Sequence, residues 1–212
     1  MSVRVTEIFH SLQGEADAVG WPTVFVRLTG CPLRCGYCDT AYAFHGGRVI
    51  EQTDVLDEVA SYDTDHVCVT GGEPLAQPGC IPLLTALCDA GHAVSIETSG
   101  ALDVAPVDAR VAIVMDVKTP GSGEHARNRA ENLALLKPTD QVKYVLTSRD
   151  DYDWALAHVR EHDVAARCQV LFSPAFGEVT PQDLAAWSLA DRAPVRFQLQ
   201  LHKVLWGNEP GR

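Results

Sequence analysis

The segment Cys31-Pro-Leu-Arg-Cys35-Gly-Tyr-Cys38 holds three of the seven cysteines of this 212-residue chain. It directly follows residues 24–29, a β-branched apolar run that predicts a buried strand. Three thiolates on a single short loop can converge on one soft metal centre. The other four cysteines lie on apolar runs or near predicted helices, where core packing accounts for them: Cys68, Cys80, Cys88 and Cys168.

Apolar runs of the same kind recur along the chain and alternate with amphipathic stretches. Strands are predicted at residues 66–70, 93–98, 111–117, 141–146, 168–172 and 195–201. Helices are predicted at residues 53–62, 81–90, 127–137, 152–162 and 181–189, the last with Thr180 as N-cap and Pro181 at its first position. Because the sequence shows no internal repeat or linker, we expect residues 1–212 to form a single domain, with the cysteine loop at 30–40.

Strands that alternate with helices predict a parallel sheet with right-handed crossovers. Polar residues come just after one predicted strand after another: Gly71-Gly72-Glu73, Glu97-Thr98-Ser99, Asp116 and Lys118, Ser173, and Gln200 with His202. A barrel places all such carboxyl ends on one rim, whereas an open doubly wound sheet concentrates its site at one switch point. We therefore expect an α/β fold, a partial (β/α) barrel of about six parallel strands that is open on one side.

The composition limits the partners. Hydrophobic residues make up 46% of the chain, enough for a full core. The 28 acidic and 17 basic residues give a net charge of -11, which argues against nucleic acid or anionic lipid as the main partner. The first residues show no basic-then-apolar signal, and no run approaches the ~18 apolar residues of a membrane span. We expect a cytoplasmic protein.

The cysteine loop has several ordinary explanations. A disulfide is disfavoured in a reducing compartment and would leave one thiol over. A structural zinc ion needs a fourth ligand, which His45 could supply, although no second Cys/His pair with finger-like spacing exists. Two-cluster ferredoxin spacing is absent. Three cysteines on a 4Fe-4S cubane, by contrast, leave one iron free to bind a substrate or cofactor.

The loop resembles the signature of the radical S-adenosylmethionine (SAM) enzymes, Cys-x3-Cys-x-aromatic-Cys, with Tyr37 at the aromatic position. The resemblance implies a 4Fe-4S cluster on Cys31, Cys35 and Cys38. It also implies that SAM chelates the open iron and is cleaved to a 5'-deoxyadenosyl radical. The fold would then be the partial barrel of the radical SAM type.

A second match strengthens this one. Thr70-Gly71-Gly72-Glu73-Pro74 resembles the segment that binds the amino end of SAM in the superfamily, and Asp116-Val117-Lys118 resembles the segment that contacts its ribose and carboxylate. The resemblance implies that the following residues contact SAM: Tyr37, Cys38, Asp39, Gly72, Glu73, Asp116, Val117, Lys118 and Ser173. The alternative for Asp116 and Lys118 is a solvated strand end, and relatives often have Ser at the position of Asp116.

Flanking residues point to one family within this superfamily. The segment Phe9-His-Ser-Leu-Gln-Gly-Glu15, together with Arg27, Cys38-Asp39-Thr40 and Gln200-Leu-His-Lys203, resembles the 7-carboxy-7-deazaguanine synthases. That resemblance implies the conversion of 6-carboxy-5,6,7,8-tetrahydropterin to 7-carboxy-7-deazaguanine with loss of ammonia, on the way to 7-deazapurines such as queuosine. SAM would act as a cofactor that is not consumed.

The same resemblance implies roles for further residues. Those expected to contact the pterin are Leu12, Gln13, Gly14, Arg27, Thr70 and His202, and Thr40 is expected to ligate Mg²⁺. Arg27 lies in an otherwise apolar strand and so needs an anion, either the substrate carboxylate or an acid such as Glu97. The family pattern Leu-Gln-Gly-Glu-Gly ends in Ala16 here, which constrains the backbone. The chain end at 207–212 would cover the pterin.

Other functions remain open from the sequence. One alternative is a glycyl-radical-enzyme activase or another small radical SAM enzyme, and a non-enzyme alternative is an iron-sulfur or zinc protein with a structural or electron-transfer role. The family resemblance implies a homodimer and a reductant such as flavodoxin or ferredoxin. Because such carriers are acidic, we expect a local basic patch around Arg34 or Arg48.

Overall fold

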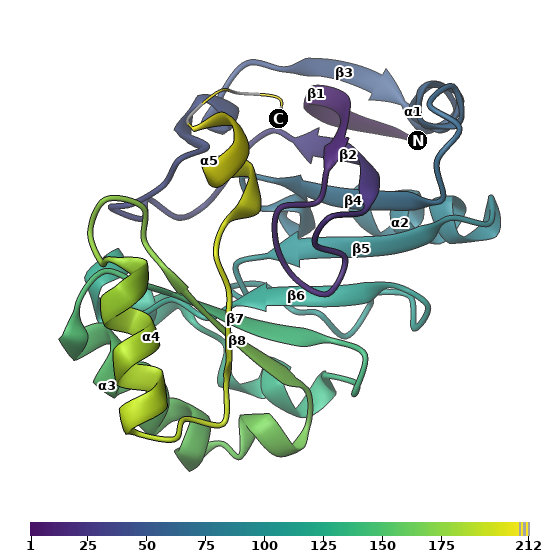
Figure 1. Cartoon of the computed structure of the whole chain (residues 1–212). Helices are drawn as coiled ribbons and strands as arrows, with labels where there is room; N and C mark the ends of the chain where they lie inside the picture. The colour runs from purple at the N-terminus through teal and green to yellow at the C-terminus, as the bar shows by residue number, and fades with distance from the viewer. Residues whose placement is uncertain (208, 210, 212) are drawn as a thin grey trace.

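The computed structural model describes residues 1–207, 209 and 211. In these residues one sheet of nine strands has the order β3-β1-β2-β4-β5-β6-β7-β8-β9. The strands are β1 (Ser2–Leu12), β2 (Pro22–Leu28), β3 (Arg48–Glu51), β4 (His66–Gly71), β5 (Ala93–Thr98), β6 (Ala112–Asp116), β7 (Gln141–Leu146), β8 (Gln169–Pro174) and β9 (Arg196–Phe197). Figure 1 shows them stacked from β3 at the top to β8 at the bottom.

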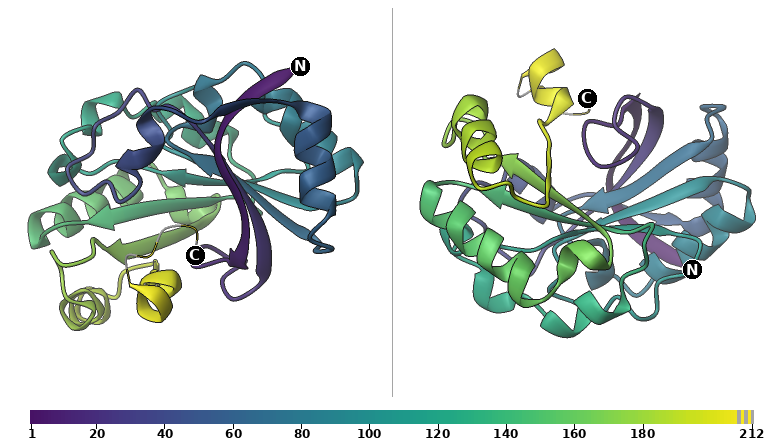
Figure 2. Two further views of the ribbon diagram at one scale, coloured as in Figure 1. Left: turned by 90° about the horizontal axis from the view of Figure 1, so that it is seen from above. Right: turned by 60° about the horizontal axis from the view of Figure 1, so that its bottom comes forward.

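From β2 to β9 all neighbouring strands are parallel and follow one another in chain order. A doubly wound sheet would reverse its strand order at a switch point, and no such reversal occurs among the parallel strands. The order is that of a barrel wound in one direction, so the predicted partial barrel is confirmed. Figure 2 shows the curvature of the sheet, with its two edges standing apart.

Five α-helices are found among the described residues. They are α1 (Gln52–Ala60), α2 (Cys80–Asp89), α3 (Arg149–Glu161), α4 (Pro181–Ala190) and α5 (Leu201–Trp206). The first four pack their apolar faces on the sheet, and the core includes the fully buried rings of Tyr144, Tyr152 and Phe172. In Figure 2, α5 lies on the opposite side of the sheet from α3. None of the described helices has the length and apolar character needed to cross a membrane.

The helix cap that was predicted from the sequence is present in the structure. The Thr180 side chain accepts a hydrogen bond from the Asp183 amide at 3.1 Å, which confirms the predicted N-cap of α4. At the start of α3, Ser148 accepts from the Asp151 amide in the same way. Each helix begins after the loop that follows a parallel strand, β7 for α3 and β8 for α4.

Four elements differ from the sequence prediction. The strands β1 and β3 were not predicted, and β1 pairs antiparallel with both of its neighbours. Residues 127–137 form short 3-10 turns, His125–Arg127 and Ala130–Leu135, where a helix was predicted. The predicted strand at 195–201 shrinks to the two residues of β9, and its last residue already begins α5.

Candidate active site

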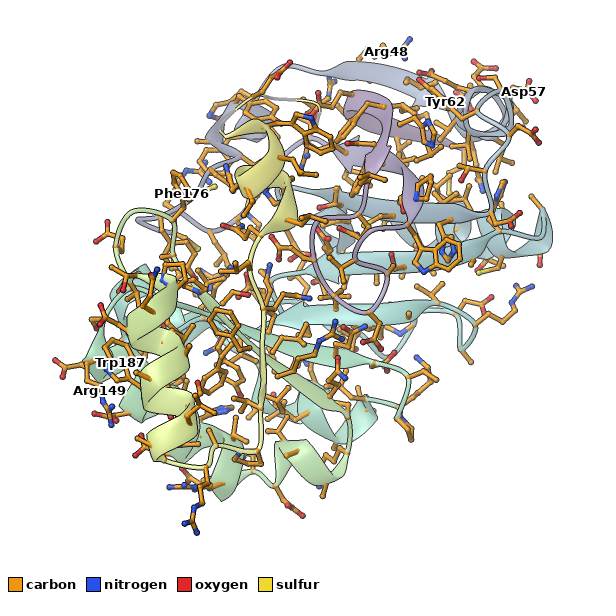
Figure 3. All side chains as sticks on the ribbon, viewed as in Figure 1. Arg48, Asp57, Tyr62, Arg149, Phe176 and Trp187 are labelled. Atoms are coloured by element: carbon orange, nitrogen blue, oxygen red, sulfur yellow. The ribbon has the colours of Figure 1, made fainter. Side chains whose placement is uncertain are left out.

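A cavity of about 560 Å³ opens at the carboxyl ends of the parallel strands. Residues from the ends of β2, β4, β5, β6 and β7 line it. The cysteine loop, the end of β1, the loop after β8 and the start of α5 complete the lining. Phe176, labelled in Figure 3, is a lining residue on the loop after β8. One rim thus collects the polar strand ends that the sequence analysis singled out.

The cysteine loop forms one wall of this cavity. Cys31, Cys35 and Cys38 are half-buried, and all three line the cavity. Burial raises the pKa of the Cys35 thiol to about 11, against the opposing charge of Lys118, so iron binding must release protons from this loop. No three His, Cys, Asp or Glu side chains of the described residues form a ready-made metal site, and the exposed His45 is not a lining residue. His45 is therefore not placed to complete a four-ligand zinc site with the three cysteines.

The segment after β6 is hydrogen-bonded to the cysteine loop. The Gly36 amide donates to the Ser122 carbonyl at 3.0 Å. Asp151, at the start of α3, in turn fixes this segment by accepting from the Gly121 amide at 2.8 Å and the Thr119 hydroxyl at 2.9 Å. The Asp151 carboxylate therefore holds the support of the cysteine loop in place.

Replacing Asp151 by alanine is expected to lower the free energy of unfolding by about 2–3 kcal/mol, because hydrogen-bond donors to a buried charge lose their acceptor. Burial alone would raise the pKa of Asp151, but its bonds to Gly121 and Thr147 hold that pKa below the ordinary value of 3.8. Its contribution is therefore present above pH ~4 and fades as the pH falls further. Urea unfolding at pH 7 and pH 3 measures this, with the exposed neighbour substitution Asp150→Ala as control. An equal loss in both variants would contradict the assigned role.

The glycine pair after β4 lets this strand approach the cysteine loop. A Cβ on Gly71 would collide with the Leu28 backbone, and one on Gly72 would collide with the Gly30 carbonyl and the Cys31 Cβ. Gly71 also has φ +155, a value that favours glycine. Gly72 lines the cavity beside the cysteines, as expected for a close approach of backbone to a ligand.

Glu73 takes a different position from the one expected. Its carboxylate is fully buried and is not among the lining residues. It accepts from the Thr98 hydroxyl at 2.9 Å, the Ser99 amide at 2.7 Å and the Leu75 amide at 3.0 Å. The carboxylate thus joins the ends of β4 and β5, and Thr98 and Ser99 line the cavity in its place.

Three residues of the predicted SAM set carry buried polar atoms without a hydrogen-bond partner. They are the hydroxyl oxygens of Tyr37 and Ser173 and one carboxylate oxygen of Asp116. Tyr37 and Asp116 line the cavity, whereas Ser173 is buried and is not a lining residue. Buried polar groups are nearly always satisfied, so the unsatisfied atoms of Tyr37 and Asp116 fit a polar ligand in the cavity. The other Asp116 oxygen accepts from Lys118 Nζ at 2.8 Å, which places both side chains at the site, while Val117 is buried in the core.

The predicted pterin residues also belong to this cavity, which is lined by Leu12, Gln13, Gly14, Arg27 and Thr70. The Thr70 hydroxyl donates to Glu97 at 2.9 Å, and the Gln13 amide nitrogen donates to the other oxygen of Glu97 at 3.4 Å. Glu97 therefore links two residues that the sequence had assigned to the substrate.

Arg27 is mostly buried, as its apolar strand predicted, with 15% of its side chain exposed. Its anion in this structure is Glu7 of the unpredicted strand β1, at 2.7 Å, and not Glu97. The Tyr42 hydroxyl donates to the same Glu7 oxygen. Arg27 thus enters the cavity with only its Nε engaged by Glu7.

The start of α5 also lines the cavity. His202 lines the cavity and lies so close to Gly14 that a Cβ there would collide with its ring. The Leu201 amide donates to the Gly14 carbonyl at 2.9 Å, which ties α5 to the turn between β1 and β2. Of the predicted cover at 207–212, Glu209 and Gly211 line the cavity, whereas residues 208, 210 and 212 lie outside the described residues.

Thr40 and Asp39 lie next to each other at the cavity wall. The Thr40 hydroxyl donates to one Asp39 oxygen at 2.9 Å, and Lys203 of α5 lies 3.1 Å from the other. Both residues present oxygen atoms of the kind that Mg²⁺ prefers.

Sequence reasoning missed one buried ion pair in the cavity floor. Lys143 of β7 lies 2.5 Å from Glu15 and 3.9 Å from Asp116, and Gln200 also donates to Glu15 at 2.8 Å. Burial alone would raise the pKa of Glu15, but Lys143 and Gln200 hold it below its ordinary value. A lysine in an otherwise apolar strand was the available signal.

The barrel and the three-cysteine loop define a radical SAM protein, and residues 25–120 match the Radical SAM superfamily. The 7-carboxy-7-deazaguanine synthase of Chlorobaculum tepidum is 45% identical over 96% of this chain and 94% of the relative. That of Koribacter versatilis is 41% identical over 98% of both chains. This chain therefore belongs to the 7-carboxy-7-deazaguanine synthase family, and the resemblance seen in the motifs is confirmed.

Solved structures agree with the fold. The crystal structure of QueE from Escherichia coli has a TM-score of 0.78 over 95% of both chains, at 21% identity. That of Streptococcus suis SuiB bound to S-adenosylmethionine has a TM-score of 0.57 and covers 81% of this chain. The likeness at such low identity concerns the fold alone.

Proposed function

We propose that this chain is a radical SAM lyase that converts 6-carboxy-5,6,7,8-tetrahydropterin to 7-carboxy-7-deazaguanine with loss of ammonia, in the biosynthesis of 7-deazapurines such as queuosine. The observation that carries the proposal is that one cavity is lined both by the three cysteines and Gly72 and by Gln13, Arg27 and Thr70. Its volume, about 560 Å³, is in the range of small-molecule sites.

Family membership implies a 4Fe-4S cluster and SAM, and the residues present fit both. Cys31, Cys35 and Cys38 would hold the cluster, which together with bound SAM supplies the radical that removes a substrate hydrogen. Gly72 would offer its backbone to the amino end of SAM, and Tyr37, Asp39, Asp116 and Lys118 would contact the rest. Ser173, which is buried and does not line the cavity, stays a prediction from the family resemblance. Glu73 and Val117 do not contact SAM in this proposal. Glu73 fixes the ends of β4 and β5 through its hydrogen bond with Thr98, and Val117 packs in the core.

The other half of the cavity would hold the pterin. The backbone of Leu12 and Gly14 and the amide of Gln13 offer donors and acceptors to the ring edge. Arg27 has guanidinium nitrogens left for a carboxylate, and Thr70 and His202 stand beside it. Burial lowers the pKa of His202, so the neutral imidazole can accept as well as donate a hydrogen bond.

Further features of the proposal follow the family. Thr40 would ligate a Mg²⁺ ion, which could neutralise substrate charge. The chain would act as a single domain, 1–212, within a homodimer in the cytoplasm. An acidic reductant protein such as flavodoxin or ferredoxin would supply electrons.

Anaerobic reconstitution tests the proposal. Iron, sulfide, reductant, SAM and carboxytetrahydropterin are expected to give 7-carboxy-7-deazaguanine by mass spectrometry. Cleavage of SAM without conversion of the pterin would refute the substrate and leave the superfamily chemistry intact. Activation of a second protein by glycyl-radical formation would instead favour the activase alternative.

Arg27→Ala is expected to weaken pterin binding about 10- to 100-fold, since it removes a charge-assisted hydrogen bond, and to leave SAM binding unchanged. Glu7→Gln removes the internal partner but keeps the guanidinium, and is expected to retain pterin binding. Calorimetric titration of both ligands into the reconstituted protein measures the two effects. If Arg27→Ala weakens both ligands equally, or Glu7→Gln weakens the pterin as much as Arg27→Ala, Arg27 is a structural residue.

A further inference from the structure

Two exposed arginines, Arg127 and Arg129, lie on the segment that packs against the cysteine loop. No ion pair links either guanidinium to a described acidic residue, in contrast to Arg110, Arg149 and Arg196, which are paired with carboxylates. The two side chains are therefore free positive charges on a chain whose net charge is -11.

Two hydrogen bonds join this segment to the cysteine loop. The Arg34 amide donates to the Glu124 carboxylate at 2.6 Å, and the Gly36 amide donates to the Ser122 carbonyl. These bonds place the segment next to the loop that would carry the cluster.

Asn128, between the two arginines, fixes their position further. Its side chain accepts from the Lys118 amide at 2.9 Å and donates to the Lys118 carbonyl at 2.8 Å. The Lys118 Nζ lies over the ring of Tyr37 in the cysteine loop, 5.6 Å from its centre. The residues on either side of Asn128 are thus held near the cysteines by bonds that do not involve their own side chains.

The basic residues expected from the sequence are less available. Arg48, at the top of Figure 3, pairs with Glu58 at 2.9 Å and belongs to β3, at the far edge of the sheet. The Arg34 guanidinium turns back onto its own loop, donating to the Cys31 and Leu33 carbonyls and lying 4.2 Å from the centre of the Phe44 ring. Arg34 adds positive charge at the loop but is committed to its structure.

We propose that Arg127 and Arg129, beside Arg34, form the docking surface for an acidic one-electron carrier protein. On a chain with a net charge of -11, positive charge at the cluster loop would favour the productive orientation of an acidic carrier and raise the association rate. In each encounter the carrier loses one electron and the cluster gains it. This inference rests on the proposed function, because it needs the cluster in the cysteine loop.

The test compares two double variants with equal change of charge. Arg127→Glu/Arg129→Glu reverses the proposed surface, and Arg160→Glu/Arg167→Glu reverses two exposed arginines near the end of α3 and before β8, at the opposite rim. Reduced flavodoxin, an acidic carrier, is mixed with each reconstituted protein, and the rate of cluster reduction is followed by stopped-flow absorbance. Binding of flavodoxin is measured separately by fluorescence anisotropy.

At low ionic strength the first variant is expected to lose at least about tenfold in both the reduction rate and the affinity, a loss that shrinks as salt is added. The second variant is expected to change much less, and dithionite is expected to reduce all proteins equally. Equal losses in the two variants, or no loss in the first, would overturn the docking surface. If dithionite yields no reduced cluster in the wild type, the proposed function itself fails.

Discussion

Replacing Cys35 by alanine is expected to abolish the cluster, so that bound iron and visible absorbance fall sharply and SAM cleavage drops to background. Cys31, Cys35 and Cys38 share one loop and one cavity wall, and two remaining thiolates cannot hold a cubane whose fourth iron must stay open. Iron and sulfide analysis after anaerobic reconstitution, followed by measurement of 5'-deoxyadenosine, checks both effects.

Cys88→Ala provides the matched control, because Cys88 is also half-buried but lies on α2, away from the cavity. It is expected to keep full iron content and to lose at most about 1 kcal/mol of stability. Retained cluster absorbance in Cys35→Ala would remove this loop from the cluster site. One tightly bound zinc ion in the wild type, without cluster absorbance, would revive the zinc alternative.

The parallel strands could be predicted because they are apolar runs buried on both faces. Strand β1 could not, because it lies near the sheet edge, is partly exposed, and carries a bulge between Val5 and Glu7. The bulge breaks the alternation of apolar and polar residues that marks such a strand. The missed strand brings Glu7 to Arg27, and so its absence from the prediction also hid the partner of that arginine.

Tertiary hydrogen bonds explain the other two errors. Asn132 is buried and bonds to the backbone of Gly100, Leu102 and Val104, which turns a helical pattern into 3-10 turns. Gln198 bonds to the amide and carbonyl of Ala16 and so leaves the sheet after β9. No local propensity encodes bonds between residues so far apart in sequence.

The same bonds explain why Ala16 is tolerated where the family pattern has glycine. Ala16 has φ 63, in the left-handed region that costs a non-glycine residue roughly 1 kcal/mol. Two hydrogen bonds from Gln198 and burial against Val114 and Leu171 hold it there. The sequence could indicate the constraint but not what compensates it.

Most site residues were predictable because chemistry-bearing side chains follow the strands, whereas the pairing of Glu15 with Lys143 joins residues 128 positions apart. Only the curvature of the barrel brings β7 to the turn after β1. Similarly, Glu73 looked like a ligand-binding carboxylate from its motif, yet its bonds to Thr98 and Ser99 depend on how β4 and β5 align. The motifs thus located the site. Which of its residues line the cavity and which hold the strand ends in place could be seen only in the fold.

Lys143→Met is expected to lower the free energy of unfolding at pH 7 by about 3–5 kcal/mol, the usual cost of leaving a buried charge without its partner. Burial alone would lower the pKa of Lys143, but Glu15, Asp116 and Glu97 raise it above its ordinary value. Without the ammonium, these carboxylates face one another in the cavity floor. We expect weaker binding of both SAM and pterin as a consequence, since Asp116 and Glu97 both line the cavity.

The pH dependence and a second variant identify the cause. The pKa of Glu15 is held below its ordinary 4.5 and that of Lys143 above its ordinary 10.5, so the pair contributes fully between these pH values. That contribution fades as the pH falls through the pKa of Glu15 or rises through that of Lys143. In Lys143→Met the unpaired Glu15 takes up a proton more readily, so the gap to the wild type should narrow from pH 7 to pH 5.

The double variant Lys143→Met/Glu15→Gln should lose less stability than the sum of its single variants, because the glutamine leaves no unpaired buried charge. Urea unfolding of all four proteins at both pH values measures the coupling. Additive losses that do not change with pH would mean that Lys143 matters through packing alone. A coupled, pH-dependent loss would instead show that Lys143 acts through its charge, by balancing the buried carboxylate of Glu15 beside it.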